Sequence, residues 1–402
     1  MAFEITRIGN ICKKVCSGGT PTSSNPDYYD GGIPWLNTNE VNFCNIYSTN
    51  KTISEEGLNH SAAKYIPVNS IIVAMYGVTA GKCAVAKIPL TTNQACCNLV
   101  IDEEKAHYQY VYHFLKLQSD NLNKLANGGA QQNLNSIIIK KFKIALPSLN
   151  IQQRIASILS AYDNLIENNN KRIRLLEQMA ENLYKEWFVR FRFPGHENAE
   201  FENGLPKGWG MERIGNVCET IGGGTPSTSK TEYWNGGIKW VTPSDITSKN
   251  SLPLLKVEVS ITEEGLKNSS AKLLPPYTIL MTSRASIGFF GVAPFEVCTN
   301  QGFISIIPQN DNLRMYMLYM LKSRKDEIIA NANGSTFLEI SKGRFRKMKM
   351  VVPSNIILDL FENKTRTIFD ETLKLEQQNT TLARQRDLLL PRLMSGKLEV
   401  NI

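Results

Sequence analysis

The feature that most constrains the fold is an internal repeat. Five short motifs from the first half return in the second half, in the same order, about 206 residues later. The pairs are residues 7–12 and 213–218, 18–21 and 223–226, 31–35 and 236–240, 53–58 and 261–266, and 92–94 and 299–301. Five matches at a nearly constant offset are not a chance event. The sequence therefore predicts two copies of one structural unit.

Length and charge are those expected of two such units with a polyanionic partner. A chain of 402 residues is longer than one ordinary core supports, and 42% hydrophobic with 20% charged residues is typical of a globular protein. The net charge is +8, divided as 20 − 18 = +2 over residues 1–205 and 25 − 19 = +6 over residues 206–402. This excess suits nucleic acid, although charge alone is weak evidence.

Each copy begins with a stretch of mixed pattern and ends with a helical one. Runs of β-branched and aromatic residues at 70–75, 278–282 and 303–307 lie between Gly, Pro, Asn and Ser, as strands lie between turns. After Pro147 and again after Pro353, Gly and Pro are absent for some 40 residues and the apolar spacing becomes helical. The fold class is therefore α+β, with two strand-rich domains and two long helices.

The helices are expected to pair as an antiparallel coiled coil about a pseudo-twofold axis, because a domain–helix–domain–helix repeat has one economical packing. The second helix repeats every seven residues at Phe361, Ile368, Leu375, Leu382 and Leu389, and its companion positions are Ile357, Lys364, Glu371, Gln378 and Gln385. In the first helix, residues 168–170 are Asn-Asn-Asn, and a buried Asn there fixes register at a cost in stability. The alternative is that each helix packs only on its own domain.

These features together resemble the specificity (S) subunit of type I restriction–modification systems, over essentially the whole chain. The resemblance is carried by the duplicated Gly-Gly-Thr-Pro loops, by Leu-Pro-Lys-Gly-Trp at 205–209, and by Leu146-Pro147 followed by Gln-Gln-Arg-Ile at 152–155. It implies a non-catalytic subunit without cofactor that binds double-stranded DNA. Each recognition domain would recognise one half of a bipartite, asymmetric target. The helices would set the spacing and dock two adenine-methyltransferase (M) subunits, which translocase/endonuclease (R) subunits then join.

The resemblance and the repeat together set the expected domain boundaries. The first target recognition domain covers residues 1–147 and its spacer helix 148–193. The second recognition domain covers 194–353, entered at 205–209, and its spacer helix 354–396, with a tail at 397–402.

Two classes of rival function remain open from the residues alone. One is a DNA methyltransferase or nuclease that carries its own recognition domains, and the other is a coiled-coil scaffold protein. Asn-Pro-Asp-Tyr at 25–28 lacks the second proline of a methyltransferase signature, and the P-loop-like stretch 77–83 ends in Cys83 where a hydroxyl is needed. No residue is therefore assigned to catalysis.

Metal and membrane sites are not expected either. The eight cysteines form no repeated C-x-x-C pairs, which predicts reduced, mostly buried thiols in a cytoplasmic protein rather than a zinc site. Apolar runs are far shorter than the roughly 18 residues that a membrane span needs.

The candidates for DNA contact lie in loops of both copies, where framework residues repeat while the candidate reading residues differ. The Gly-Thr-Pro loops offer small residues and backbone N–H groups suited to phosphates, with ordinary turn chemistry as the equal alternative. Gly81 aligns with Gly288, and the loops around them carry Lys82 and Arg284; Arg is the better partner for guanine, and the alternative is an ordinary hairpin with a solvated cation. Gln and Asn at 131–133 suit adenine, with a polar loop as the equal alternative. The candidates are Gly19, Thr20, Thr22, Lys82, Gln131, Gln132, Asn133, Gly224, Thr225, Thr228, Lys230 and Arg284.

The ends of the two helices carry more apolar residues than a two-stranded seam buries. Exposed patches of that kind mark interfaces, so a partner surface is expected there. The alternative is that these residues cap the neighbouring recognition domains. The candidates are Trp187, Phe188, Phe191, Leu388, Leu389 and Leu393.

Overall fold

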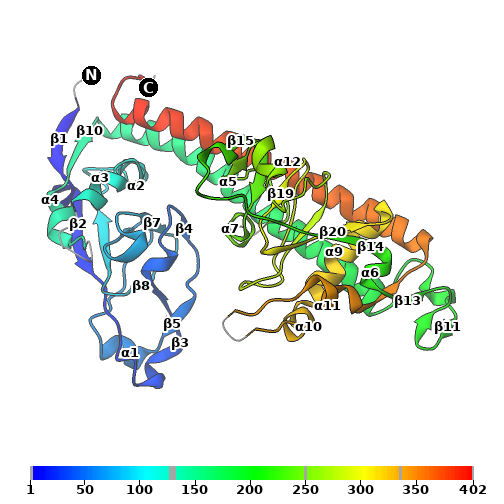
Figure 1. Cartoon of the computed structure of the whole chain (residues 1–402). Helices are drawn as coiled ribbons and strands as arrows, with labels where there is room; N and C mark the ends of the chain where they lie inside the picture. Colours follow the sequence, from blue (N-terminus) through cyan, green and yellow to red (C-terminus); the bar gives the residue numbers. More distant parts are fainter. Residues whose placement is uncertain (1–2, 126–132, 249–250, 335–336, 401–402) are drawn as a thin grey trace. The chain divides into compact units, whose positions relative to one another are not determined.

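The computed structural model describes residues 3–125, 133–248, 251–334 and 337–400. The chain divides into two compact units. Unit 1 contains Met1–Leu165 and Leu382–Ile402, and unit 2 contains Ile166–Thr381. Each unit has a strand-rich part and takes one segment from each of two long helices, α5 (Leu149–Tyr184) and α12 (Asn355–Met394) (Figure 1). The predicted α+β class with two long helices is confirmed.

Unit 1 is built on three sheets. Its largest sheet has the order β2-β9-β6-β7-β4, and smaller sheets have the orders β5-β3-β8 and β1-β10. The strands are β1 Glu4–Arg7, β2 Cys12–Ser17, β3 Tyr29–Leu36, β4 Asn45–Ile46, β5 Lys51–Ile53, β6 Ile71–Ala74, β7 Cys83–Ala86, β8 Thr91–Thr92, β9 Cys96–Ile101 and β10 Lys143–Leu146. The short helices are α1 Glu55–Asn59, α2 Tyr108–Leu117, α3 Ser119–Lys124 and α4 Ser136–Lys141.

Unit 2 repeats this arrangement. Its sheets have the orders β14-β20-β17-β18, β16-β15-β19 and β13-β21, with a separate hairpin β11-β12. The strands are β11 Phe201–Glu202, β12 Leu205–Pro206, β13 Gly210–Arg213, β14 Cys218–Gly222, β15 Trp234–Val241, β16 Ser260–Ile261, β17 Ile279–Thr282, β18 Phe290–Val292, β19 Cys298–Thr299, β20 Phe303–Pro308 and β21 Lys349–Val352. The short helices are α6 Ile214–Val217, α7 Pro243–Thr247, α8 Glu263–Lys267, α9 Arg314–Ser323, α10 Lys325–Ala330 and α11 Lys342–Lys347.

The two units share irregular details as well as strand order. In β3 and in β15 the pairing register shifts at the same place, between Tyr29 and Ile33 and between Trp234 and Ile238. Both strands also pair in parallel with a two-residue strand, β8 or β19. Since β-bulges are inherited features of a fold, the duplication predicted from sequence is a duplication of structure. The strands predicted at 70–75, 278–282 and 303–307 are present as β6, β17 and β20.

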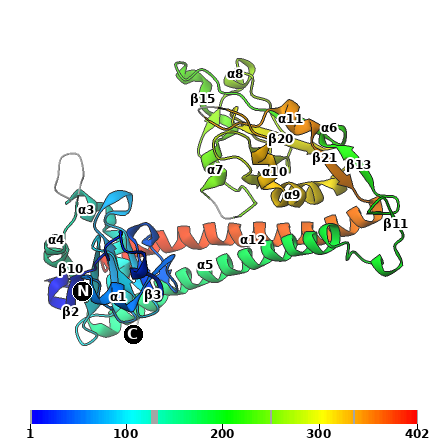
Figure 2. The same ribbon diagram turned by 90° about the horizontal axis from the view of Figure 1, so that it is seen from below.

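Within each unit, the segments of α5 and α12 lie side by side and antiparallel (Figure 2). In unit 2, Asn169 faces Asn379 and, three residues further along α5, Arg172 faces Glu371. In unit 1, Asp163 of α5 contacts Arg386 of α12. Partner numbers fall as the α5 number rises, which is the signature of an antiparallel pair.

Polar residues occupy one of the two heptad positions of α12. Phe361 and Leu375 are buried as predicted, and so is the expected companion Ile357, but the later companion positions are one residue further along the helix than expected. The observed companion positions are Leu358, Thr365, Thr372, Asn379, Arg386 and Leu393, of which all but Arg386 are buried. The threonine hydroxyls donate to the carbonyls of Phe361 and Ile368 four residues earlier, so their burial leaves no unpaired donor. Which of the two sets of companion positions is buried depends on the face of α12 that α5 and the sheets cover.

The predicted buried asparagine is present. Asn169 and Asn379 are 7% and 8% exposed, and the Asn169 amide donates to Asn379 Oδ1 at 3.0 Å. Asn379 in turn donates to Asn170 Oδ1 at 2.9 Å. A slip of one turn would leave these amides buried without partners, so the pair fixes the register of the seam.

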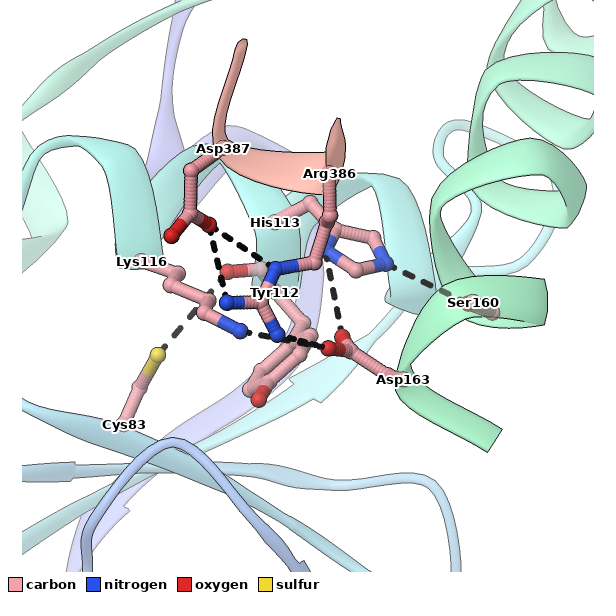
Figure 3. Close-up of polar contacts among 8 residues, drawn as sticks. All are labelled: Cys83, Tyr112, His113, Lys116, Ser160, Asp163, Arg386 and Asp387. Atoms are coloured by element: carbon pink, nitrogen blue, oxygen red, sulfur yellow. Dashed lines mark hydrogen bonds and ion pairs between the residues drawn. The ribbon is translucent and has the colours of Figure 1, made fainter. Parts of the chain in front are cut away.

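A charged cluster attaches both helices to the domain of unit 1 (Figure 3). Asp163 of α5 accepts from Lys116 of α2 at 3.4 Å and contacts Arg386 of α12. The fully buried His113 lies beside them, with Nε2 at 3.2 Å from Ser160 Oγ and Nδ1 at 3.8 Å from Asp163. Burial, opposed by Asp163, lowers the pKa of His113 to about 4, so the imidazole is neutral at pH 7 and the carboxylate is balanced by the two cations.

Candidate nucleic-acid interface

The Gly-Gly-Thr-Pro loops are held in place by contacts that occur in both units. A Cβ on Gly19 would lie 2.2 Å from the backbone N of Ala63, and one on Gly224 would lie 2.4 Å from the backbone N of Ala271. The N–H groups of Gly19 and Gly224 donate at 2.9 Å to the carbonyls of Thr92 and Thr299. These two amides are therefore not free for phosphate, which corrects the sequence-based expectation for both glycines.

Two further bonds repeat from unit to unit. The indole of Trp35 donates to the carbonyl of Gly19 at 2.9 Å, and Trp240 donates to Gly224 at the same distance. The Thr20 hydroxyl bonds Gln94 Oε1, as the Thr225 hydroxyl bonds Gln301 Oε1. The repeated Thr-Asn-Gln motif thus serves to brace the loop. Sequence comparison found that motif but gave no sign of its partner.

The residues that follow the buried glycines in these loops are exposed. Thr20, Thr22, Thr225, Thr228 and Lys230 are all exposed, while Gly19 and Gly224 are buried. The Lys230 ammonium donates to the Tyr233 hydroxyl at 2.9 Å. The hydroxylated residues, which lie one residue or more beyond the buried glycines, therefore remain the candidates in each loop for contact with DNA phosphates.

The two hairpin loops hold their predicted cations differently. Gly81 and Gly288 both have positive φ, +81° and +78°, as their alignment implied. Lys82 lies in the loop between β6 and β7 but is half-buried, and its ammonium donates to Asn42 Oδ1 at 2.9 Å. Arg284 lies in the loop between β17 and β18, exposed, with Nε 3.7 Å from Glu339 Oε2. Arg284 is thus much the freer of the two to reach DNA.

The remaining candidate loop is described only at its end. Gln131 and Gln132 lie outside the described residues. Asn133 is exposed and directly precedes Leu134, which is fully buried.

The candidate partner residues pack mostly inside their own unit. Trp187 and Phe188, in a π-helical turn (Lys185–Val189) that follows α5, pack with Phe361 and are 5% and 8% exposed; Leu393 is 1% exposed. The expectation that these three stand exposed is corrected, because the domain core of each unit covers them. Phe191 and Leu389 are half-buried, and Leu388 is 63% exposed.

The motif that imitates a methyltransferase signature is turn chemistry. Asn25 precedes a 3-10 turn (Pro26–Tyr28) and its side chain accepts from the N–H of Asp27. Tyr28 stacks on His60 with ring centroids 5.6 Å apart. These contacts account for the Asn-Pro-Asp-Tyr sequence without a reacting group.

The cysteines, the candidate metal ligands and the helices of the described residues bear on whether the chain has a reactive thiol, a metal site or a membrane span. None of the eight cysteines, all of which lie in the described part of the chain, forms a disulfide, and five of them are buried. Burial raises the pKa of Cys97 to about 12, so its thiol stays protonated. Among the described residues, no three His, Cys, Asp or Glu side chains gather as metal ligands. Within the same residues, no helix is both long and apolar enough to cross a membrane.

Comparison with known proteins agrees with this geometry. The family model described as the type I restriction modification DNA specificity domain matches residues 2–178 and 206–378. The chain is 27% identical to the type I restriction enzyme MjaIX specificity subunit of Methanocaldococcus jannaschii, covering 99% of this chain and 96% of that protein. It is 24% identical to the HindI specificity subunit of Haemophilus influenzae, over 65% and 70% of the two chains.

A solved structure has the same fold. The S subunit of a type I restriction–modification system from M. genitalium superposes with a TM-score of 0.61 at 16% identity, covering 97% of this chain and 96% of that one. The duplicated domains with bracing loops, joined to long helices, define a DNA sequence-recognition protein. This chain belongs to the family of type I restriction–modification DNA specificity domains and carries two of them.

Proposed function

We propose that each recognition domain of this specificity subunit recognises one half of a bipartite, asymmetric target in double-stranded DNA. The domains are those at residues 1–147 and 194–353, and the long helices at 148–193 and 354–396 set the distance between the half-sites. The subunit performs no chemistry itself and acts in the cytoplasm, where the DNA of the cell lies.

One observation carries this proposal: the bonds that brace the Gly-Gly-Thr-Pro loops are the same in both domains, whereas the hairpin loops after β6 and β17 carry different side chains, the half-buried Lys82 in one and the exposed Arg284 in the other. Trp35 and Trp240 make the same bond, and so do Thr20 and Thr225. Loops that are held in the same way in both domains suit contact with the phosphate backbone of DNA, which is the same in any sequence. Side chains that differ suit base edges, because two half-sites of an asymmetric target differ in sequence.

The proposed partners are two adenine-methyltransferase subunits, one for each copy of the repeat, with translocase/endonuclease subunits joining through them. A duplicated protein presents two related surfaces, and a partner that fits one is expected to fit the other. Leu388, 63% exposed on α12, and the half-buried Phe191 and Leu389 are the predicted contacts among the apolar candidates.

The test is to express the subunit with its methyltransferase subunits in a host without DNA methylation, and to map methylated adenines by sequencing. We expect methylation within one bipartite motif whose two parts flank a spacer of unspecified sequence. Mass measurement of the purified complex should give two methyltransferase subunits per chain. Methylation at a single uninterrupted motif, or a one-to-one complex, would contradict the proposal.

A further inference from the structure

Tyr76 and Arg284 occupy the same place in their two units. Tyr76 lies two residues after the end of β6, and Arg284 lies two residues after the end of β17. In unit 1 the preceding residue, Met75, donates its N–H to the Ala95 carbonyl at 2.8 Å and accepts from the N–H of Leu134 at 3.0 Å. In unit 2 the preceding residue, Ser283, makes the same two bonds at the same distances, to the Gly302 carbonyl and from the N–H of Ile340. The residue after each, Gly77 or Ala285, has positive φ, +73° and +60°. Tyr76 and Arg284 are therefore structural equivalents, which the sequence repeat did not reveal.

A second variable position lies next to the first. Asn133 directly precedes Leu134, and Glu339 directly precedes Ile340, so they too are equivalents. Glu339 forms an isolated β-bridge with Arg284, and its carboxylate lies 3.7 Å from the guanidinium Nε. Unit 2 thus holds a charged pair, each side chain 48% exposed, where unit 1 holds the neutral and exposed Tyr76 and Asn133.

Both pairs adjoin the braced loops. Ala95 and Gly302, which accept the backbone bonds, directly follow Gln94 and Gln301, the partners of the Thr20 and Thr225 hydroxyls. The brace between Thr and Gln, which is the same in both units, therefore lies within a few residues of the pair of side chains that differs between them.

The surface around the pairs is apolar as well as exposed. Val78 is 99% and Tyr76 40% exposed in unit 1, and Phe337 is 60% and Leu338 46% exposed in unit 2. Large apolar side chains gathered on exposed loops usually mark an interaction site. For a DNA specificity domain the occupant is the duplex, whose major groove presents thymine methyl groups beside hydrogen-bonding base edges.

We propose that these two pairs are specificity-determining positions, each setting the accepted base pair at one place in its half-site. In unit 2, Arg284 donates to the O6 and N7 of a guanine, and Glu339 is a positioning residue that restrains the guanidinium from its Nε side. The terminal nitrogens then remain for the base. In unit 1, Tyr76 and Asn133 present a different edge, so the two half-sites differ at this place. The inference rests on the proposed recognition of two half-sites.

The test compares the methylation motifs of complexes that contain single variants of the specificity subunit. Arg284→Ala should relax discrimination at one base pair of one half-site by roughly 10- to 100-fold and leave the other half-site unchanged. Glu339→Gln should relax the same base pair to a smaller extent, and Arg284→Lys should fail to restore the preference because it cannot make two parallel bonds. Lys207→Ala, which removes an exposed charge paired with Glu200, is the matched control and should change no base preference.

Thermal unfolding of each variant complex checks that the units remain folded. The inference is overturned if folded Arg284→Ala and Glu339→Gln complexes keep the discrimination of the original protein, or if Arg284→Ala weakens binding equally at all sequences, as loss of a phosphate contact would. If instead the unaltered complex methylates no bipartite motif, the proposed function itself fails, so the two failures are distinguishable.

Discussion

At the scale of single residues, His113 shows how burial controls charge. Its ring is fully buried near Asp163, Lys116 and Arg386. The carboxylate favours the protonated ring, but burial outweighs it and holds the pKa at about 4, below the ordinary value of 6.5. The unfolded chain therefore takes up a proton at this residue at a higher pH than the native protein does, and stability is lost as pH falls.

We expect His113→Gln to reduce the pH dependence of stability. Between pH 7 and pH 5 the histidine contributes a loss of about 2 kcal/mol, as follows from the two pKa values. Urea unfolding at both pH values should show a smaller loss for the variant, with parallel behaviour of the two proteins between pH 7 and 8. An equal loss in both proteins from pH 7 to 5 would contradict the assignment of a neutral buried ring.

Glycines in the braced loops give a second test at this scale. Gly224→Ala places a Cβ 2.2 Å from Ser270 Oγ and 2.4 Å from a backbone nitrogen, so the backbone must move. We expect a loss of about 1–3 kcal/mol in the stability of unit 2. The matched control is Gly237→Ala, whose Cβ meets nothing within 4 Å and which should change stability by less than about 0.5 kcal/mol. Thermal unfolding of the two variants decides, and equal effects would argue against close packing of the loop.

At the scale of elements, the helix seam combines apolar contact with polar selection. Leu358, Phe361 and Leu375 supply burial, while Asn169 and Asn379 bond only in one register. A seam of leucine alone would be more stable but would accept several alignments. The polar residues therefore lower stability in exchange for a single helix alignment.

A double-mutant cycle tests this balance. Asn379→Leu alone removes the acceptor at 3.0 Å from the Asn169 amide, leaving it only Gln378 Oε1 at 3.4 Å, and we expect it to cost about 1–3 kcal/mol. Adding Asn169→Leu should recover most or all of the loss, because both polar groups are then removed. Thr372→Val is the control on the same heptad position, since its hydroxyl bonds only its own helix. Additive losses in urea unfolding would show that the two asparagines are not coupled.

At the scale of the whole molecule, the proposed role of the helices is to fix the distance between half-sites. Asn169 and Asn379 face each other, so an added heptad must enter both helices at facing points to keep the seam in register. Seven residues inserted after Lys171 and seven after Glu376 meet this requirement. An insertion into one helix alone would displace the residues beyond it along the other helix, so that they no longer meet their partners in the seam.

We expect the paired insertion to lengthen the spacer of the methylated motif by about three base pairs and to leave both half-sites unchanged. Seven residues at 1.5 Å each add about 10.5 Å, and a base-pair step is about 3.4 Å. Methylation mapping gives the spacer directly, and insertion into α12 alone serves as the control that should lose methylation. An unchanged spacer in a folded, active complex would rule out the helices as the determinant of spacing.

The sequence by itself determined the duplication, the strands and helices, and the buried asparagine. These follow from patterns of two, three and a half, or about 206 residues, which local backbone geometry and gene duplication impose regardless of what lies nearby. The braced loops were located in the sequence for the same reason, since Gly-Gly-Thr-Pro and Thr-Asn-Gln both repeat.

Only the tertiary structure decided which faces are covered and which residues meet. Trp187 and Leu393 are buried by their own units, and Lys82 is bound by Asn42. The equivalence of Tyr76 with Arg284 rests on bonds from residues 134 and 340, which share no local pattern with the loops they touch. Periodicity states that a helix has an apolar face or that a loop follows a strand. Burial and pairing depend on segments far away in the chain, and no local pattern contains that information.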